Sequence, residues 1–324
     1  MSARSLKVSV VIPTRNAGCG FRGLLEKLGT QEGDFELEIV VVDSGSTDGT
    51  AELAEEYGAS VHRIRGSEFN HGATRNLGIS LTHGEYVALI VQDALPQDSR
   101  WLAPMVENLE RDGRVAVVYG RQLPRPGSDA LTRALVNGLT TAGLERREQE
   151  ISSPEAYLTM SPAERRRVAA FDNVSSCLRR SVWEEFPFEK TDFAEDLRWG
   201  KRVVEAGYKI VYEPRSAVVH SHERGALYDL RRHYVDQLVL AELFGIHQVP
   251  DLPRLVLGIP YSARHVYNML GREEPGNKLR HALLAARHAI PTRLGVYLGG
   301  KAASIARLSP GLHARLHRFL SSGV

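Results

Sequence analysis

Short apolar runs alternate with amphipathic segments along the first third of the chain. Four runs rich in β-branched residues are typical of buried strands: Val8–Ile12, Glu38–Asp43, Ser60–Ile64 and Tyr86–Val91. Between them, apolar residues at helical spacing predict three helices: Phe21–Leu28, Thr50–Tyr57 and Gly72–Leu81. Strands that alternate with helices predict an α/β protein with a parallel, doubly wound sheet.

The alternation of strands and helices becomes less regular after Tyr119 and resumes at Asn173. A helix at Trp101–Glu110 and a strand at Val115–Tyr119 continue the alternation, but Arg121–Arg167 holds four prolines and mixed helical fragments. We expect that segment to be a long excursion or lid rather than part of the sheet. Regular elements resume afterwards, with a strand at Asn173–Leu178, a helix at Glu195–Ala206 and two short strands: Tyr208–Tyr212 and Ala217–His220. From Leu227 onward the chain is predicted to be helical.

Charge is distributed unevenly along the chain. The 324 residues carry a formal net charge of only +2, so no strong overall field and no nucleic-acid partner are expected. The region from Arg224 onward, however, is rich in Arg, Lys and His and poor in acids. Amphipathic segments at Leu279–Ile290 and Leu312–Leu320 suggest docking on an anionic membrane surface. A solvated helix face, an oligomer interface and packing against the rest of the chain remain alternatives.

Cysteine content and hydropathy fit a cytoplasmic protein. The two cysteines, Cys19 and Cys177, do not form a disulfide scaffold or a cysteine-based zinc site. The start, Met1–Lys7, is short and polar, and no run of 18 apolar residues occurs. We therefore expect neither a signal peptide nor a membrane span, and at most a peripheral position on the inner face of the cell membrane.

Polar side chains follow directly on the predicted strands. Asp43 ends the second strand, and Asp93 follows the fourth. The first strand leads into Pro13, Thr14, Arg15 and Asn16. Ligands bind at the carboxyl ends of strands in open α/β sheets, so we expect a base and ribose pocket there. Asp43 taken alone fits a turn-capping role as well.

A second group of polar residues lies later in the chain. Glu195 and Asp196 open a predicted helix, where the helix dipole alone would favour acids, but either carboxylate is also a candidate general base. Phe193 and Trp199 flank the pair and are candidates for an apolar wall and a sugar-stacking face. His220 and His222 follow a strand and are candidate ligands for Mg²⁺ or Mn²⁺.

In order and spacing, these motifs resemble the inverting family 2 glycosyltransferases of the A-type fold. The resemblance runs from about Val8 to His222 and rests on six motifs: Val-Ile-Pro-Thr-Arg-Asn, Val-Val-Asp-Ser-Gly-Ser-Thr-Asp-Gly-Thr, Gly-Ala-Thr-Arg-Asn, Gln-Asp-Ala, Glu-Asp and the following His. It implies a Rossmann-like nucleotide-binding half (about 1–120) fused to an acceptor half (about 121–223). Residues 224–324 would then form a basic helical C-terminal region.

The resemblance also implies roles for single residues. Asp196 would be the general base, with Glu195 orienting the acceptor. Asp93 and His220 would bind Mg²⁺ or Mn²⁺, with His222 as an alternative ligand. Arg75 would lie near the diphosphate, and Asp43 would accept the N3–H of the base. The full implied nucleotide-sugar set is Pro13, Thr14, Arg15, Asn16, Asp43, Ser44, Arg75, Gln92 and Asp93.

One departure from the family pattern bears on the donor. The usual Asp-X-Asp motif would place its first acid at Val91, whereas the chain has Gln92-Asp93-Ala94, which resembles the rhamnosyltransferase branch. The implied donor is L-rhamnose linked to dTDP or UDP, and the implied acceptor is a cell-surface polysaccharide or a lipid-linked glycan. The alternatives are a transferase for another hexose, a non-catalytic relative and a sugar nucleotidyltransferase. Oligomeric state is left open.

Overall fold

The chain forms two compact units. A computed structural model describes residues 6–323, so the polar start Met1–Ser5 and the last residue lie outside the described residues. Unit 1 comprises Met1–Leu123 and Thr140–His220, and unit 2 comprises Pro124–Leu139 and Ser221–Val324. The break after His220 lies close to the predicted boundary at 223. Residues 124–139, however, belong with unit 2 rather than with the predicted acceptor half.

Unit 1 is built on one sheet. Within residues 6–323 this sheet has nine strands, in the order β3-β2-β1-β4-β8-β6-β9-β5, with β7 paired to β9. The strands are β1 (Leu6–Thr14), β2 (Phe35–Asp43), β3 (Ser60–Arg63), β4 (Tyr86–Ile90), β5 (Leu95–Pro96), β6 (Val115–Leu123), β7 (Arg147–Gln149), β8 (Ser175–Arg179) and β9 (Lys209–Val219). All the strands predicted from sequence are present.

The expectation of an all-parallel sheet is wrong for the second half. Strands β1 to β4 are parallel to one another, but β8 runs antiparallel to both β4 and β6. The chain enters β8 from the excursion after β6 instead of from a crossover helix, so no right-handed βαβ unit forms there. The sheet is therefore mixed.

Two further predictions differ from the structure. The segments Tyr208–Tyr212 and Ala217–His220 belong to one strand, β9, whose register with β6 shifts between Gly120 and Arg121. This irregularity accommodates Pro214 without ending the strand. The excursion Arg121–Arg167 also contributes to the sheet, because it contains β7 and the end of β6.

Helices cover both faces of the sheet. In β4, Tyr86, Ala88 and Ile90 pack toward α1 (Gly20–Gly29) and α4 (Ala103–Arg111). The alternate residues Val87 and Leu89 pack with the cluster that includes α3 (His71–Ser80), α8 (Arg180–Glu185) and α9 (Glu195–Glu205). Because successive side chains of a strand point to opposite faces, a continuous apolar run such as Tyr86–Ile90 fits this two-sided burial.

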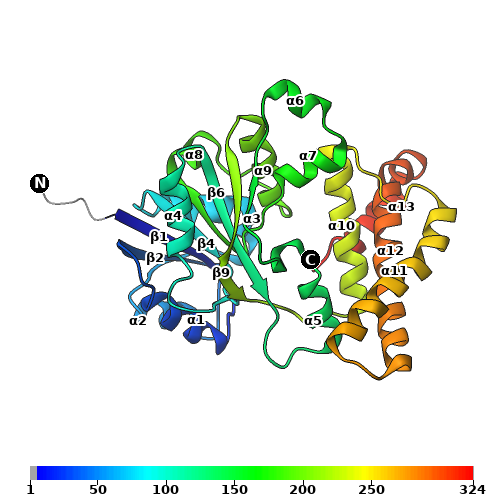
Figure 1. The fold of residues 1–324 in the computed structure, drawn as a ribbon, viewed down its shortest axis with the longest axis horizontal. Helices are drawn as coiled ribbons and strands as arrows, with labels where there is room; N and C mark the ends of the chain where they lie inside the picture. The colour runs from blue at the N-terminus through cyan, green and yellow to red at the C-terminus, as the bar shows by residue number, and fades with distance from the viewer. Residues whose placement is uncertain (1–5, 324) are drawn as a thin grey trace, which may run out of the picture. The chain divides into compact units, whose positions relative to one another are not determined.

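Shorter helices complete unit 1, and unit 2 is helical (Figure 1). In unit 1 these are α2 (Thr50–Glu56), α6 (Pro154–Thr159), α7 (Pro162–Ala169) and the 3₁₀ turns Gly66–Glu68 and Thr140–Ala142. Unit 2 contains α5 (Ala130–Asn137), α10 (Ala226–Phe244), α11 (Leu252–Glu273), α12 (Lys278–Leu308) and α13 (Pro310–Leu320). No helix within residues 6–323 is both long and apolar enough to cross a bilayer.

Candidate active site

The loops after β1 and β2 are held together by hydrogen bonds centred on Asp43. Its carboxylate accepts hydrogen bonds from the Thr14 hydroxyl (2.9 Å), the Ser46 hydroxyl (2.5 Å) and the backbone N–H groups of Gly45 and Ser46. Burial raises the pKa of Asp43, but the hydrogen bonds from Ser46, Thr14 and Gly45 outweigh it and hold that pKa below its ordinary value. Asp43 therefore shapes this loop, and it could accept a base N–H only if a hydroxyl donor turned away.

Neighbouring residues extend the same network. Asn16 adopts a left-handed conformation (φ 46°), and its side chain accepts a hydrogen bond from the Thr47 N–H (2.8 Å). Ser44 is buried and donates its hydroxyl proton to the Thr14 carbonyl (2.8 Å). The predicted polar residues of the first two strand ends are thus brought together at one edge of the sheet.

Gln92 ties the Asp93 loop to the first loop. The Arg15 N–H donates to Gln92 Oε1 (2.7 Å), and Gln92 Nε2 donates to the Arg15 carbonyl (3.2 Å). The amide side chain thereby pairs with the Arg15 backbone much as a neighbouring strand would. A glutamine at this position keeps the end of β1 beside Asp93.

These loops border a cavity of about 280 Å³ in unit 1. Its lining is Pro13, Thr14, Arg15, Ser44, Phe69, His71, Arg75, Val91 and Gln92. The structure therefore gathers six of the predicted nucleotide-sugar residues around one space, with Asn16, Asp43 and Asp93 outside the lining. The volume is close to the lower end of the range for small-molecule sites, about 300–1,000 Å³, and suits part of a nucleotide-sugar.

Arg75 forms a buried ion pair with Glu195. Arg75 Nη1 lies 2.9 Å from Glu195 Oε1, and each side chain is only 7% exposed. Burial by itself raises the pKa of Glu195, but the positive charge of Arg75, with a further contribution from His71, holds it below its ordinary value. Asn173 also donates to Glu195 (3.1 Å). Glu195 is thus tied to Arg75, which lines the cavity.

The ion pair between Arg75 and Glu195 is possible because the start of α3 lies very close to the backbone that leads into α9. A Cβ added to Gly72, in the first turn of α3, would lie 1.9 Å from the Glu189 carbonyl oxygen. Only glycine lets the start of α3 approach the segment that leads into α9 so closely. On the α9 side of the ion pair, Ala194 adopts a left-handed conformation (φ 57°) directly before Glu195. Such strain in a non-glycine residue is concentrated at functional sites.

Asp196 differs electrostatically from its neighbour. Burial, followed by the negative charges of Glu195 and Asp172, raises the pKa of the Asp196 carboxyl to about 7. The Leu197 N–H donates to its Oδ1 (2.7 Å), which opposes this shift only in part. One carboxylate of the pair is therefore held as an anion by arginine, while the other can exchange a proton near neutral pH.

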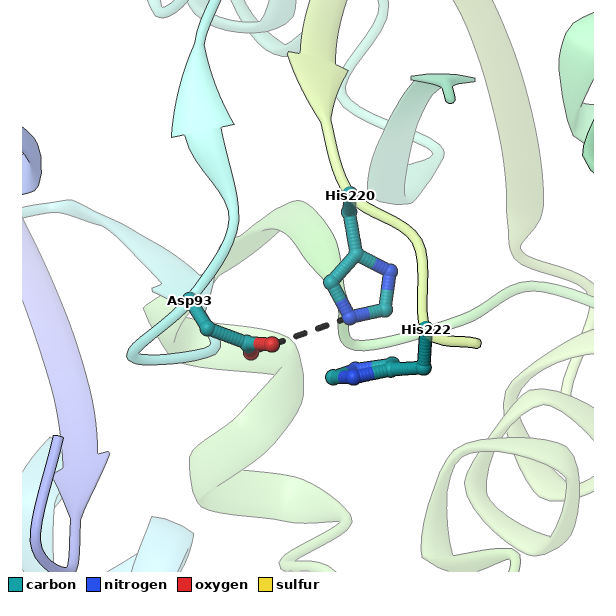
Figure 2. Close-up of side chains that lie close together, drawn as sticks. All are labelled: Asp93, His220 and His222. Carbon is teal, nitrogen blue, oxygen red and sulfur yellow. Dashed lines mark ion pairs between the residues drawn. The ribbon is translucent and has the colours of Figure 1, made fainter. Parts of the chain in front are cut away.

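Asp93 and His220 face each other. Figure 2 shows the Asp93 carboxylate and the His220 ring pointing toward one another, with His220 Nε2 3.7 Å from Asp93 Oδ1. His222 follows two residues later, and one ligand atom from each of the three side chains lies within 4.8 Å of the others. Carboxylate oxygen with imidazole nitrogen is a donor set that suits Mn²⁺ and, with more water, Mg²⁺.

A chain of hydrogen bonds lies behind His220. Gln122 Nε2 donates to Asp172 Oδ2 (2.9 Å), and Gln122 Oε1 lies 3.2 Å from His220 Nδ1. The amide oxygen can only accept, so the proton of the neutral imidazole belongs on Nδ1, which leaves Nε2 with a lone pair toward Asp93. Asp172 is also one of the charges that raise the pKa of Asp196. The candidate metal ligands and the candidate base are thus linked through Gln122 and Asp172.

Comparison with known proteins identifies the family. The sequence model described as glycosyl transferase family 2 matches residues 9–169. The chain is 30% identical over 236 residues to the O-antigen chain rhamnosyltransferase RfbN of Salmonella typhimurium, covering 71% of each chain. It is likewise 30% identical over 231 residues to the O-antigen chain rhamnosyltransferase WbaN of Salmonella anatum, covering 70% of each. The chain belongs to glycosyltransferase family 2.

Solved structures agree on the fold of this family 2 glycosyltransferase. A crystal structure of residues 1–349 of TarS from S. aureus matches with a TM-score of 0.50 at 17% identity, covering 92% of this chain and 91% of that one. The predicted A-type glycosyltransferase fold and the predicted enzyme class are confirmed.

The prediction for Trp199 is wrong. Its side chain is fully buried, packs against Phe171 and Phe188, and donates its indole N–H to the Phe186 carbonyl (2.5 Å). An indole enclosed in the core presents no face for a sugar to stack on. Phe193 is only partly buried, and its contact with an acceptor stays a prediction.

Several residues of the candidate site were missed by sequence reasoning. Phe69 and His71 line the cavity and pack edge to face, with ring centroids 4.9 Å apart. Gln122 and Asp172 were assigned to the irregular excursion or passed over. Phe69 could have been found from the sequence, because it is an aromatic residue just before the start of a predicted helix. Nothing local marked Gln122, because its two partners lie 50 and 98 residues away.

Proposed function

We propose that the protein is an inverting rhamnosyltransferase. It would move L-rhamnose from a nucleoside diphosphate, dTDP or UDP, to a hydroxyl of a cell-surface polysaccharide or lipid-linked glycan. For the donor, the main support is the 30% identity to two O-antigen chain rhamnosyltransferases over about 70% of the chain. For the chemistry, the observation that carries the proposal is Asp196, whose pKa is raised to about 7 beside an ion-paired Glu195.

The proposed reaction is a single displacement. The acceptor hydroxyl gives its proton to the Asp196 carboxylate while its oxygen forms a bond to the anomeric carbon of the donor. The bond from that carbon to the diphosphate oxygen breaks, the nucleoside diphosphate leaves with the electron pair, and the anomeric configuration inverts. A base with a pKa near the working pH is efficient at this task. The cavity supports the donor half of the proposal, with Thr14, Arg15 and Phe69 at the base and Arg75 toward the diphosphate.

The residues present fit a divalent cation. Asp93 and His220 would hold it, with His222 as a third ligand, and Gln122 would fix the tautomer in which His220 Nε2 can bind metal. When bound, the cation would neutralise charge on the leaving diphosphate. Arg75, whose charge is balanced by Glu195 at 2.9 Å, would donate hydrogen bonds to the diphosphate.

Replacing Gln122 by leucine should weaken metal binding. The variant loses the hydrogen bond that orients His220, so the affinity for Mn²⁺, measured by calorimetry on the full chain, is expected to fall about 10–100-fold. The matched control is Gln97→Leu, because Gln97 is an exposed glutamine of the same unit. Equal Mn²⁺ affinity in Gln122→Leu and wild type would remove Gln122 from this role.

A panel of donors tests the substrate assignment. The full chain is incubated with dTDP- and UDP-linked L-rhamnose and with UDP-linked glucose, galactose and N-acetylglucosamine, and nucleoside diphosphate release is measured. We expect a rhamnose donor to be turned over fastest, because an active site discriminates by its fit to the sugar in the transition state. Faster release from the glucose, galactose or N-acetylglucosamine donor would contradict the rhamnosyl assignment and leave the transferase class intact.

A further inference from the structure

Helix α12 of unit 2 buries mostly small residues and leaves several large apolar residues exposed. Its buried side includes Ala285, Ala289, Gly295, Gly299 and Ala302. A Cβ added to Gly295 would lie 2.3 Å from the Leu230 carbonyl oxygen of α10, and one added to Gly299 would lie 2.5 Å from that of Tyr234. The two helices therefore pack backbone to backbone, and the large apolar residues of α12 are not needed for that contact.

The opposite side of α12 carries an exposed apolar stripe. We define this α12 stripe as Leu279, Leu283, Ile290 and Leu294, which are 73%, 64%, 49% and 37% exposed. Their spacing of 4, 7 and 4 residues places them along one line of the helix. Scattered exposed leucines need no explanation, but an aligned set on a helix whose buried positions are mostly alanine and glycine does.

The charged residues in the segment that carries the α12 stripe are all basic, and one of them, Arg280, pairs with Glu274 just before the helix (Nη1 to Oε1, 3.0 Å). Residues 278–324 contain no Asp or Glu but have eight basic residues: Lys278, Arg280, Arg287, Arg293, Lys301, Arg307, Arg315 and Arg318. Arg287 is exposed and lies between Leu283 and Ile290 on the flank of the stripe. A stripe of large apolar residues flanked by arginine is the pattern of helices that lie in a membrane interface.

We propose that the α12 stripe docks on an anionic lipid surface. The apolar side chains would enter the boundary between headgroups and acyl chains, and the flanking basic residues would pair with acidic headgroups. A second copy of the chain fits less well, because a two-fold contact would bring the same acid-free basic segments together. This interaction does not depend on the proposed transfer reaction.

Vesicle flotation tests the proposal on the full chain. Vesicles of phosphatidylglycerol with phosphatidylethanolamine are compared with vesicles of phosphatidylcholine at low salt. We expect flotation with the first kind only, and weaker flotation when salt is raised, because salt screens the headgroup charge. The double variant Leu283→Gln/Ile290→Gln should bind about tenfold more weakly or worse, since two apolar side chains no longer leave water.

The control removes the same kind of side chain from unit 1. Leu144 and Leu158 are 73% and 71% exposed there, so Leu144→Gln/Leu158→Gln should float as wild type does. Thermal unfolding confirms that both double variants are folded. The proposal fails if wild type does not float with anionic vesicles or if Leu283→Gln/Ile290→Gln floats as wild type does. It also fails if that variant changes only the oligomeric mass of the protein in solution, because the stripe would then be an interface between copies of the chain.

Discussion

The variant Asp196→Asn loses transfer and keeps donor binding. Asparagine fills the same space but cannot take a proton from the acceptor hydroxyl, so the rate is expected to fall about 10²–10⁴-fold. The residues that line the donor cavity do not include Asp196, so the affinity for the nucleoside diphosphate should be unchanged within error. Transfer rate and nucleotide affinity are measured on the same preparation.

Stability separates this loss of chemistry from misfolding. The pKa of Asp196 is raised in the folded protein, so folding favours its neutral form, and the chain loses stability as pH rises from the ordinary value of 3.8 toward about 7. The asparagine side chain in the variant carries no charge and avoids that loss. The melting temperature of Asp196→Asn at pH 8 should therefore match or exceed that of wild type. A clearly lower value, or transfer at the wild-type rate, contradicts the assignment of Asp196 as base.

The variant Glu195→Gln should be strongly destabilised. Its amide replaces the carboxylate that neutralises Arg75 in a site where both side chains are 7% exposed. Removing one partner of a buried ion pair leaves an uncompensated charge, which typically costs about 3–5 kcal/mol in free energy of unfolding. Denaturant unfolding of wild type and variant gives this difference directly.

The control for Glu195 lies nearby. Glu189 is 45% exposed, and its carboxylate makes only a long contact (3.8 Å) with Arg198, which is 14% exposed. Water reaches the Glu189 carboxylate, so Glu189→Gln should cost about 1 kcal/mol or less. If Glu195→Gln is as stable as Glu189→Gln, the ion pair with Arg75 does not hold α3 against the start of α9. That result would instead support the predicted role of Glu195 in orienting the acceptor.

The sequence pattern predicts the first four strands and the loops after them well because its signals are local. The runs before Pro13, Asp43 and Asp93 are buried strands, and the loops after them meet at one edge of the sheet, as the βα alternation requires. The apolar spacing in Phe21–Leu28 likewise identifies α1. In each case, the apolar pattern that marks the element and the turn that ends it lie within a few residues of each other.

Other features depend on contacts between distant residues and were not predictable in this way. The short strand β8 (Ser-Ser-Cys-Leu-Arg) carries no local mark of its direction, and only its pairing with β4 and β6 shows that it is antiparallel. Trp199 beside two carboxylates resembles a sugar platform, whereas the apolar side of α9 buries it. The partner of Arg75 lies 120 residues further along the chain, so the sequence suggested a phosphate contact but not the ion pair with Glu195.

The pH dependence of the reaction tests the central claim most directly. With the donor that the panel selects, kcat/KM for nucleoside diphosphate release is measured from about pH 5 to about pH 9, since this parameter reports the essential base of the free enzyme. A base whose pKa is about 7 predicts a rate that rises with pH and levels off above about 7. A flat profile across this range, or a rate that falls as pH rises through 7, would contradict the account.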